Sequence, residues 1–140
     1  MAQGATIGHW LVKQEPDGYP WEAFARDGRT SWDGVRNYQA RNNLRAMGVG
    51  DPVLFYASGE SKSVVGIARV SKAAYPDPTS EEAAWVSVEL EAVRKLAQPV
   101  SLAQIRGDPA LKGVILVRHT RLSVMPLSRP EFERIVRLGG

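Results

Sequence analysis

The order in which β-rich and helical segments follow one another constrains this chain more than any other feature of its sequence. Residues 85–93 alternate apolar with polar side chains, which is the pattern of a strand with one buried and one solvent-exposed face. Further β-rich runs lie at residues 9–13, 52–57, 63–70 and 121–125. Because short helices interrupt these runs irregularly, a parallel doubly wound sheet is not expected. We predict an α+β fold whose mixed or antiparallel sheet is curled into a small barrel, with short flanking helices.

The helices are predicted from the residues that begin and end them. Asn or Ser at an N-cap accepts a hydrogen bond from the first helical turn, proline suits that turn, and glycine follows the last one. Such signals occur at residues 20–28 and 37–50, and in the capping boxes of Ser101 with Gln104 and Ser128 with Glu131. Residues 31–36 are expected to form a loop between the first two helices.

The composition permits nucleic-acid binding and excludes several chemistries. The net charge of +3 favours a polyanionic partner if the positive side chains are concentrated on one face. The chain has no cysteine, so disulfides, cysteine-based zinc sites and thiol catalysis are excluded. The two histidines, His9 and His119, are isolated in the sequence. We therefore expect neither a metal ion nor a cofactor.

The length of 140 residues suits one domain, and we expect residues 1–140 to fold as a single unit. No apolar run is long enough for a signal sequence or a membrane span. The expectation from these features is a cytoplasmic protein with no membrane partner. We also expect a monomer.

The densest group of aromatic and polar side chains lies in residues 31–45, SWDGVRNYQARNNLR. Trp32 and Tyr38 offer flat faces on which a nucleobase taken out of its stack can lie, and Asn37 can read the edge of that base. Nearby arginines can hold the flanking phosphates. In the alternative interpretation, Trp32 anchors the core and the arginines are merely solvated. The residues alone leave both possibilities open.

A second polar group, residues 13–16, ends the first predicted strand. Lys13 and Glu15 are two residues apart on a strand, so their side chains share a face. They could form a surface ion pair or part of a polar site. Residues 75–79 form a stiff turn, which is either a plain connector or the rim of a pocket.

Several segments of this chain resemble the EVE domain, and they follow one another in the same order. These segments are residues 10–17 (WLVKQEPD), 31–45, 50–56, 65–70, 74–79 and 121–126. The resemblance spans residues 8–138, and the chain is similar to bacterial stand-alone EVE proteins. It implies a PUA-like barrel, a fold whose members bind RNA or DNA and in several cases enclose a modified base.

The resemblance also implies which residues bind the base or ligand. They are Lys13, Glu15, Pro16, Trp32, Val35, Arg36, Asn37, Tyr38, Arg41, Ser58 and Ser123. The expected phosphate-binding residues are Arg36, Arg41 and Arg45, and no catalytic residue or metal ligand is implied. Gln14 stands where the family's motif has serine, which could alter the preferred base.

Three functions are compatible with these residues. The first is a module that binds DNA or RNA and holds a modified base, such as a modified cytosine. The second is a sensor of a free nucleoside or nucleotide. The third is an amidohydrolase similar to ASCH proteins, which would use Lys13 and Glu15 on a modified nucleoside, although Gln14 between them offers no hydroxyl nucleophile. We expect the first, a binding module that is not an enzyme.

Overall fold

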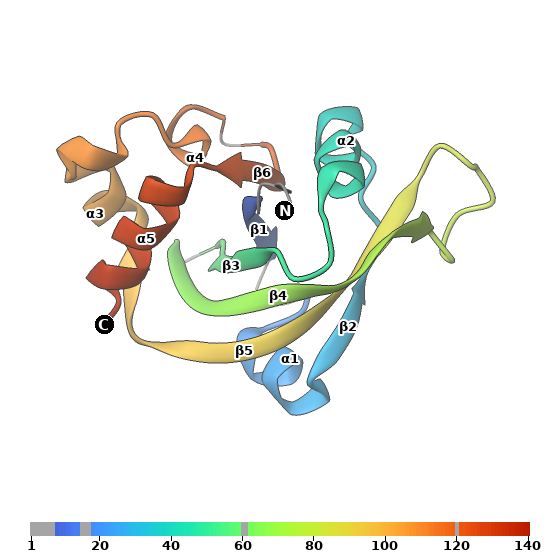
Figure 1. Cartoon of the computed structure of the whole chain (residues 1–140), viewed down its shortest axis with the longest axis horizontal. Coiled ribbons are helices and arrows are strands. Elements are labelled where there is room, and N and C mark those ends of the chain that lie inside the picture. The colour runs from blue at the N-terminus through green and yellow to red at the C-terminus, as the bar shows by residue number, and fades with distance from the viewer. Residues whose placement is uncertain (1–7, 15–17, 60–61, 120) are drawn as a thin grey trace, which may run out of the picture.

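The computed structural model describes residues 8–14, 18–59, 62–119 and 121–140. Its strands are β1 (His9–Gln14), β2 (Arg29–Trp32), β3 (Pro52–Ala57), β4 (Ser63–Pro76), β5 (Val86–Ser101) and β6 (Val124–Leu127) (Figure 1). Its α-helices are α1 (Trp21–Asp27), α2 (Tyr38–Ala46), α3 (Leu102–Gly107), α4 (Ile115–Arg118) and α5 (Arg129–Leu138). Among the described helices, none combines the length and the hydropathy that a membrane crossing needs.

All six strands belong to one sheet, in the order β2-β5-β4-β3-β1-β6. β1 and β3 are parallel, whereas each of the other neighbouring pairs is antiparallel. The long strands β4 and β5 sweep together around one side of the molecule, as Figure 1 shows. The predicted α+β class with a curled, mixed sheet is therefore confirmed. In the described part of the chain, β2 and β6 remain edge strands, so the sheet is curled but not closed.

The capping residues predicted the starts of α2, α3 and α5, whereas α4 was not predicted, because Val114 at its N-cap forms no side-chain hydrogen bond. The side chain of Asn37 accepts a hydrogen bond from the backbone N–H of Ala40 at 2.9 Å, which begins α2 where it was expected. Both capping boxes, at Ser101 and Ser128, are formed at the starts of α3 and α5. Gly28 follows α1 with a φ of 79°, a conformation that glycine adopts without steric cost.

The two central strands are longer than the sequence predicts. β5 continues to Ser101 instead of ending near residue 93, and β4 continues to Pro76. Bulges shift the register between these strands at several points, so the regular alternation of apolar and polar side chains is lost. Ser87 was expected on the solvent-exposed face but is fully buried, because residues 86–88 are covered on both faces of the sheet.

The two edge strands also differ from the prediction. Residues 29–32 form β2 along the edge of β5, so the expected loop is shorter and begins only after Trp32. β6 begins at Val124 rather than at residue 121, and both Val124 and Met125 are fully buried. Alternation fails here because α2 and α4 both pack against β6.

Aromatic side chains from three elements form the centre of the core. The ring of Phe55 on β3 lies 5.5 Å from Trp21, 5.7 Å from Phe24 and 5.8 Å from Trp32, measured between centroids. Trp21 also lies directly on the backbone of Gly66, where a Cβ would come within 2.5 Å of the ring. The absence of a side chain at Gly66 therefore lets α1 approach the sheet closely.

Candidate functional site

The carboxyl end of β1 brings several of the expected site residues together. Because β1 and β3 are parallel, both strands end at the same edge of the sheet. Ser58 follows β3 and donates hydrogen bonds to the carbonyl of Gln14 from its backbone N–H (2.9 Å) and its hydroxyl (3.2 Å). The backbone N–H of Lys13 donates to the carbonyl of Ser123 at 2.9 Å. Lys13, Ser58 and Ser123 are thus neighbours, whereas Glu15 and Pro16 lie outside the described residues.

A cleft of about 460 Å³ opens on one side of this strand end. We call it the Lys13 cleft, and its polar lining is Lys13, Tyr56, Ser58, Lys62, Ser101 and Arg106. No carboxylate occurs among the described residues that line it. Burial lowers the pKa of Lys13 and raises the pKa of Tyr56, and the positive charge of Arg106 opposes the shift at Tyr56. The cleft is therefore suited to an anionic or strongly polar ligand.

Trp32 lies on the other side of the same strand end. With Gln14, Tyr19 and Ser31, it lines a polar hollow of about 340 Å³. Only 5% of Trp32 is exposed, and its ring packs against Phe24 and Phe55. The structure thus gives Trp32 the environment of a core anchor, one of the two interpretations that its sequence allowed.

Asp77 holds the loop that follows β2. Its carboxylate accepts hydrogen bonds at 2.9 Å from the backbone N–H of Gly34 and from the guanidinium of Arg36. Arg36 also donates to the hydroxyl of Thr79 at 3.1 Å, and Val35 between these residues is buried. The turn at residues 75–79, which the sequence predicted as either a plain connector or the rim of a pocket, therefore positions Val35 and Arg36. Asp77 itself was missed, because nothing in its local sequence shows a partner 41 residues away.

Burial alone would raise the pKa of Asp77, but hydrogen bonds from Thr79, Arg36 and Gly34 outweigh it. Together they hold the pKa of this carboxyl well below its ordinary range. Asp77 thus stays ionised at neutral pH, and the ion pair with Arg36 is an integral part of the loop.

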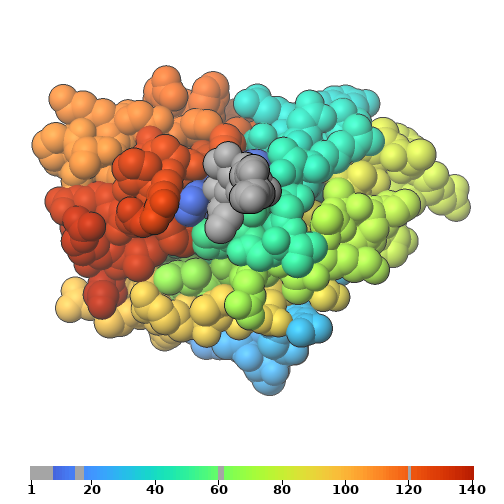
Figure 2. Space-filling model, viewed as in Figure 1, coloured from blue at the N-terminus to red at the C-terminus, as the bar shows by residue number. Residues whose placement is uncertain are grey.

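An exposed tyrosine, Tyr38, lies against a buried tryptophan at the start of α2, and Figure 2 shows this helix beside the tip of the β4–β5 hairpin. Tyr38 is 62% exposed, Trp85 is 8% exposed, and the centroids of their rings lie 4.9 Å apart. The guanidinium of Arg41 lies 5.0 Å from the Tyr38 ring, and that of Arg36 lies 5.5 Å from the Trp85 ring. We call Tyr38, Trp85, Arg36 and Arg41 the Tyr38 patch. The sequence did not indicate Trp85 as a site residue, because the alternating pattern of residues 85–93 makes it the first residue of a predicted strand.

Of the remaining expected site residues, Asn37 and Arg41 form hydrogen bonds within the protein. The amide oxygen of Asn37 is used as the N-cap of α2, so only its amide nitrogen remains for a ligand. Arg41 donates to the carbonyl of Ala84 at 3.2 Å and to the side chain of Asn42 at 2.8 Å. Arg45 is exposed on the last turn of α2. The expected phosphate-binding arginines are therefore engaged within the protein at two of three positions.

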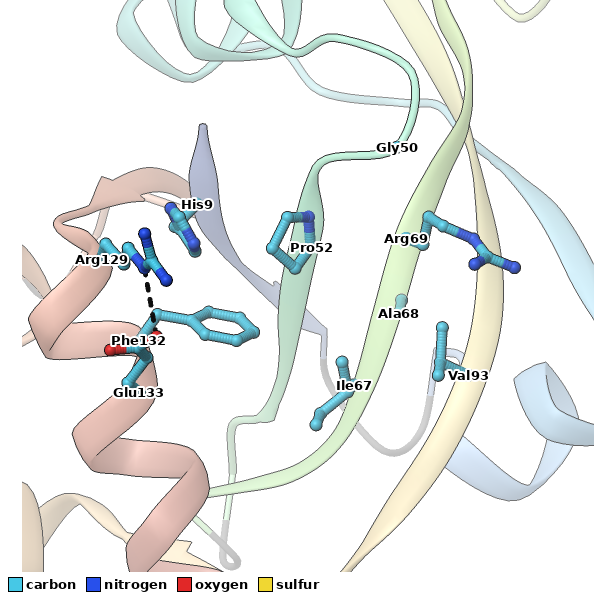
Figure 3. A pocket seen from close by; sticks show the side chains of 10 residues that line it. All are labelled: His9, Gly50, Pro52, Ile67, Ala68, Arg69, Val93, Arg129, Phe132 and Glu133. Atoms are coloured by element: carbon cyan, nitrogen blue, oxygen red, sulfur yellow. Dashed lines mark hydrogen bonds and ion pairs between the residues drawn. The ribbon is translucent and has the colours of Figure 1, made fainter. Parts of the chain in front are cut away.

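A further hollow, of about 750 Å³, lies at the opposite end of β1, between α5 and the strands β3 and β4 (Figure 3). Its lining includes apolar Pro52, Ile67 and Phe132 together with Arg69 and Arg129. Both arginines pair with carboxylates, Arg129 with Glu133 at 3.1 Å and Arg69 with Glu91. The hollow is thus less suited to an anion than the Lys13 cleft. Among the described residues, no group of three or more His, Asp or Glu side chains could hold a metal ion.

The described residues form a curled six-stranded sheet with a polar site at the end of its first strand, as expected for an EVE domain. The model of the EVE domain family matches residues 8–138, so the chain belongs to the EVE domain family.

Individual relatives are similar over nearly the whole chain. Human thymocyte nuclear protein 1 is 34% identical over 165 aligned residues, which cover 93% of this chain and 73% of that protein. A crystal structure of a protein from Agrobacterium tumefaciens is 42% identical, with a TM-score of 0.94 over 96% of this chain and 94% of the other. The human THYN1 protein in complex with 5-methylcytosine-containing DNA is 33% identical, with a TM-score of 0.86 over 94% and 97% of the two chains.

Proposed function

We propose that this protein binds DNA and holds a modified cytosine at the carboxyl end of β1. The observation that carries the proposal is the complex of human THYN1 with 5-methylcytosine-containing DNA, a protein of the same fold that is 33% identical to this chain. The site residues agree with such a ligand. Lys13, Ser58 and Ser123 offer polar groups at one strand end, and Tyr38 offers an exposed aromatic ring. The helix that begins with Tyr38, α2, packs against β6, which is the strand next to β1.

Holding an extracted base requires both aromatic stacking and polar contacts to the edge of the base. Extracting a base from a duplex costs a few kcal/mol, and stacking on one aromatic side chain returns about 1–3 kcal/mol. Polar contacts to the base edge must supply the remainder. Tyr38 is the exposed stacking group in this account, because the Trp32 ring is occupied by Phe24 and Phe55.

Binding accounts for the site better than catalysis does. A nucleophilic mechanism based on a hydroxyl needs that hydroxyl within hydrogen-bond reach of a base. The residue between Lys13 and Glu15 is Gln14, and the Ser58 hydroxyl donates its hydrogen bond to the carbonyl of Gln14 at 3.2 Å. Lys13 and the Ser58 hydroxyl therefore serve to hold and orient a base in this proposal, with no covalent step.

Affinity enrichment tests the proposal without assuming which base is bound. The protein would be immobilised and offered sheared genomic DNA, total RNA and a nucleoside mixture, and the bound nucleosides would be measured by mass spectrometry. We expect enrichment of a modified cytosine from DNA, and loss of that enrichment with Tyr38→Ala. Retention of unmodified bulk DNA would contradict the proposal. Enrichment from the nucleoside mixture alone would identify a free-ligand sensor instead.

A further inference from the structure

The strongest unassigned feature is the concentration of positive charge in the Lys13 cleft. Lys62 from the β3–β4 connection and Arg106 from α3 face the same cavity as Lys13, although they are far apart in sequence. Neither Lys62 nor Arg106 forms an ion pair with a described residue. Arg69 and Arg129 in the 750 Å³ hollow both pair with glutamates. Among the described residues, the Lys13 cleft thus has two cations without an ion-pair partner, whereas both arginines of the other hollow are paired.

The backbone fixes the positions of these two cations. The N–H of Leu102 donates to the carbonyl of Lys62 at 2.8 Å, and Ser63 pairs with Ser101 across β4 and β5. The capping box of Ser101 and Gln104 then sets the start of α3, whose last turn carries Arg106. Arg106 and Tyr56 both line the cleft, and the positive charge of Arg106 opposes the rise that burial causes in the pKa of the Tyr56 phenol.

Lys62 has an unusual backbone conformation. Its φ of 43° lies in the left-handed region, and it is the one residue other than glycine with a positive φ in the described part of the chain. Glycine or asparagine would adopt this conformation at lower cost, so a lysine here is locally unfavourable. Such strain persists where the surrounding structure enforces it, and it is concentrated at functional sites.

We infer that Lys62 and Arg106 form a phosphate-binding site for the nucleic-acid backbone next to the held base. The inference rests on the proposed function, since Lys13 and Ser58 belong both to the cleft and to the strand end that holds the base. Three cations, two serine hydroxyls and no carboxylate among the described lining residues match the chemistry of a phosphodiester. Leu102, Ala103 and Leu116 supply an apolar wall against which a sugar can lie.

The test compares two double variants that remove the same charge. The double variant Lys62→Asn with Arg106→Gln removes the two cations that form no ion pair with a described residue. Asparagine is chosen because it suits the left-handed backbone at residue 62. Lys95→Asn with Arg94→Gln is the matched control, because these exposed residues line a separate hollow beside Trp21. Affinity for a 5-methylcytosine-containing oligonucleotide would be measured over a series of salt concentrations.

We expect the cleft variant to bind more weakly, with a log–log salt slope shallower by about 2, roughly 1 for each cation removed. The ratio of affinities for methylated and unmethylated DNA should stay unchanged, because phosphate contacts carry no sequence information. The control variant should keep the slope of the natural protein. An unchanged slope in the cleft variant, or a changed methylation ratio, would overturn the phosphate assignment.

A second measurement separates this inference from the proposed function. If the natural protein showed no preference for the modified base, the proposed function would fail and the cleft would still be testable. Amide chemical shifts of Lys62, Ser101 and Arg106 should then respond to a deoxycytidine oligonucleotide and not to deoxycytidine. A response to deoxycytidine itself refutes a phosphate site. Saturation by deoxycytidine monophosphate as tight as by the oligonucleotide assigns the cleft to a free nucleotide and refutes the backbone role.

Discussion

At the residue scale, Trp32 and Tyr38 have opposite environments although six positions separate them. Trp32 is 5% exposed and Tyr38 is 62% exposed. We expect Trp32→Ala to lower the free energy of unfolding by ~3–5 kcal/mol, because it leaves a large cavity beside Phe24 and Phe55. Tyr38→Ala should change stability by less than ~0.5 kcal/mol. Urea unfolding of both variants measures the difference.

Tyr38→Ala, which should change stability little, should change DNA binding strongly. Tyr38→Ala should weaken DNA binding by ~1–3 kcal/mol, about tenfold to a hundredfold, because it removes the exposed stacking surface. Tyr38→Phe keeps the ring and serves as the control. A Tyr38→Ala protein with the natural affinity would refute the stacking role of this residue, and a stable Trp32→Ala protein would refute the core role of Trp32.

Asp77 makes stability depend on pH. The pKa of this buried carboxyl is lower in the folded protein than in the unfolded chain, where it is about 3.9. The folded protein therefore binds fewer protons, so this contribution to stability is complete at neutral pH and is lost as the pH falls below about 5. We expect the free energy of unfolding to decline in acid, and Asp77→Asn to show a flatter decline from a lower starting value.

The control for this prediction is Glu91→Gln. Hydrogen bonds from Arg69 and Arg29 also lower the pKa of Glu91, but this side chain lies in a surface ion pair that solvent screens. Because solvent screening reduces its contribution, its variant should change the acid dependence less than Asp77→Asn does. Equal slopes in Asp77→Asn and the natural protein would show that Asp77 does not control acid stability.

At the element scale, Asn37 links the stability of α2 to the binding site. Asn37→Ala should cost ~0.5–2 kcal/mol of stability, because the N–H of Ala40 loses its cap. Asn37→Ser preserves an N-cap oxygen but removes the amide nitrogen. If that nitrogen reads the base, Asn37→Ser should fold normally and bind more weakly. Normal binding by Asn37→Ser would restrict Asn37 to capping.

Local signals predicted α1, α2, α3 and α5, but not α4, and they failed for part of the sheet. Caps act within one helical turn, so Asn37, Ser101 and Ser128 identify the helix starts from sequence alone. β2 and the second half of β5 depend on pairing with distant segments. Register shifts between β4 and β5 also remove the period of two on which strand prediction depends.

At the scale of the whole molecule, the site is assembled from segments that are remote in sequence. Lys13 and Ser58 were expected together on the basis of family resemblance, and the parallel pairing of β1 and β3 places them at one edge. Lys62, Arg106 and Trp85 were missed, because an isolated cation or tryptophan carries no local sign of the cavity or ring that it faces. Only the fold brings Lys62 and Arg106 to the Lys13 cleft, and Trp85 to the ring of Tyr38.

The measurement that tests the central claim most directly is a paired titration of this protein with two DNA oligonucleotides that differ only in one cytosine methyl group. Burial of a methyl group contributes about 0.8 kcal/mol, or roughly a fourfold difference in affinity. We predict that the methylated oligonucleotide binds more tightly by at least this factor, and that Tyr38→Ala weakens its binding. Equal affinities for the two oligonucleotides would contradict the assignment of this protein as a reader of a modified cytosine.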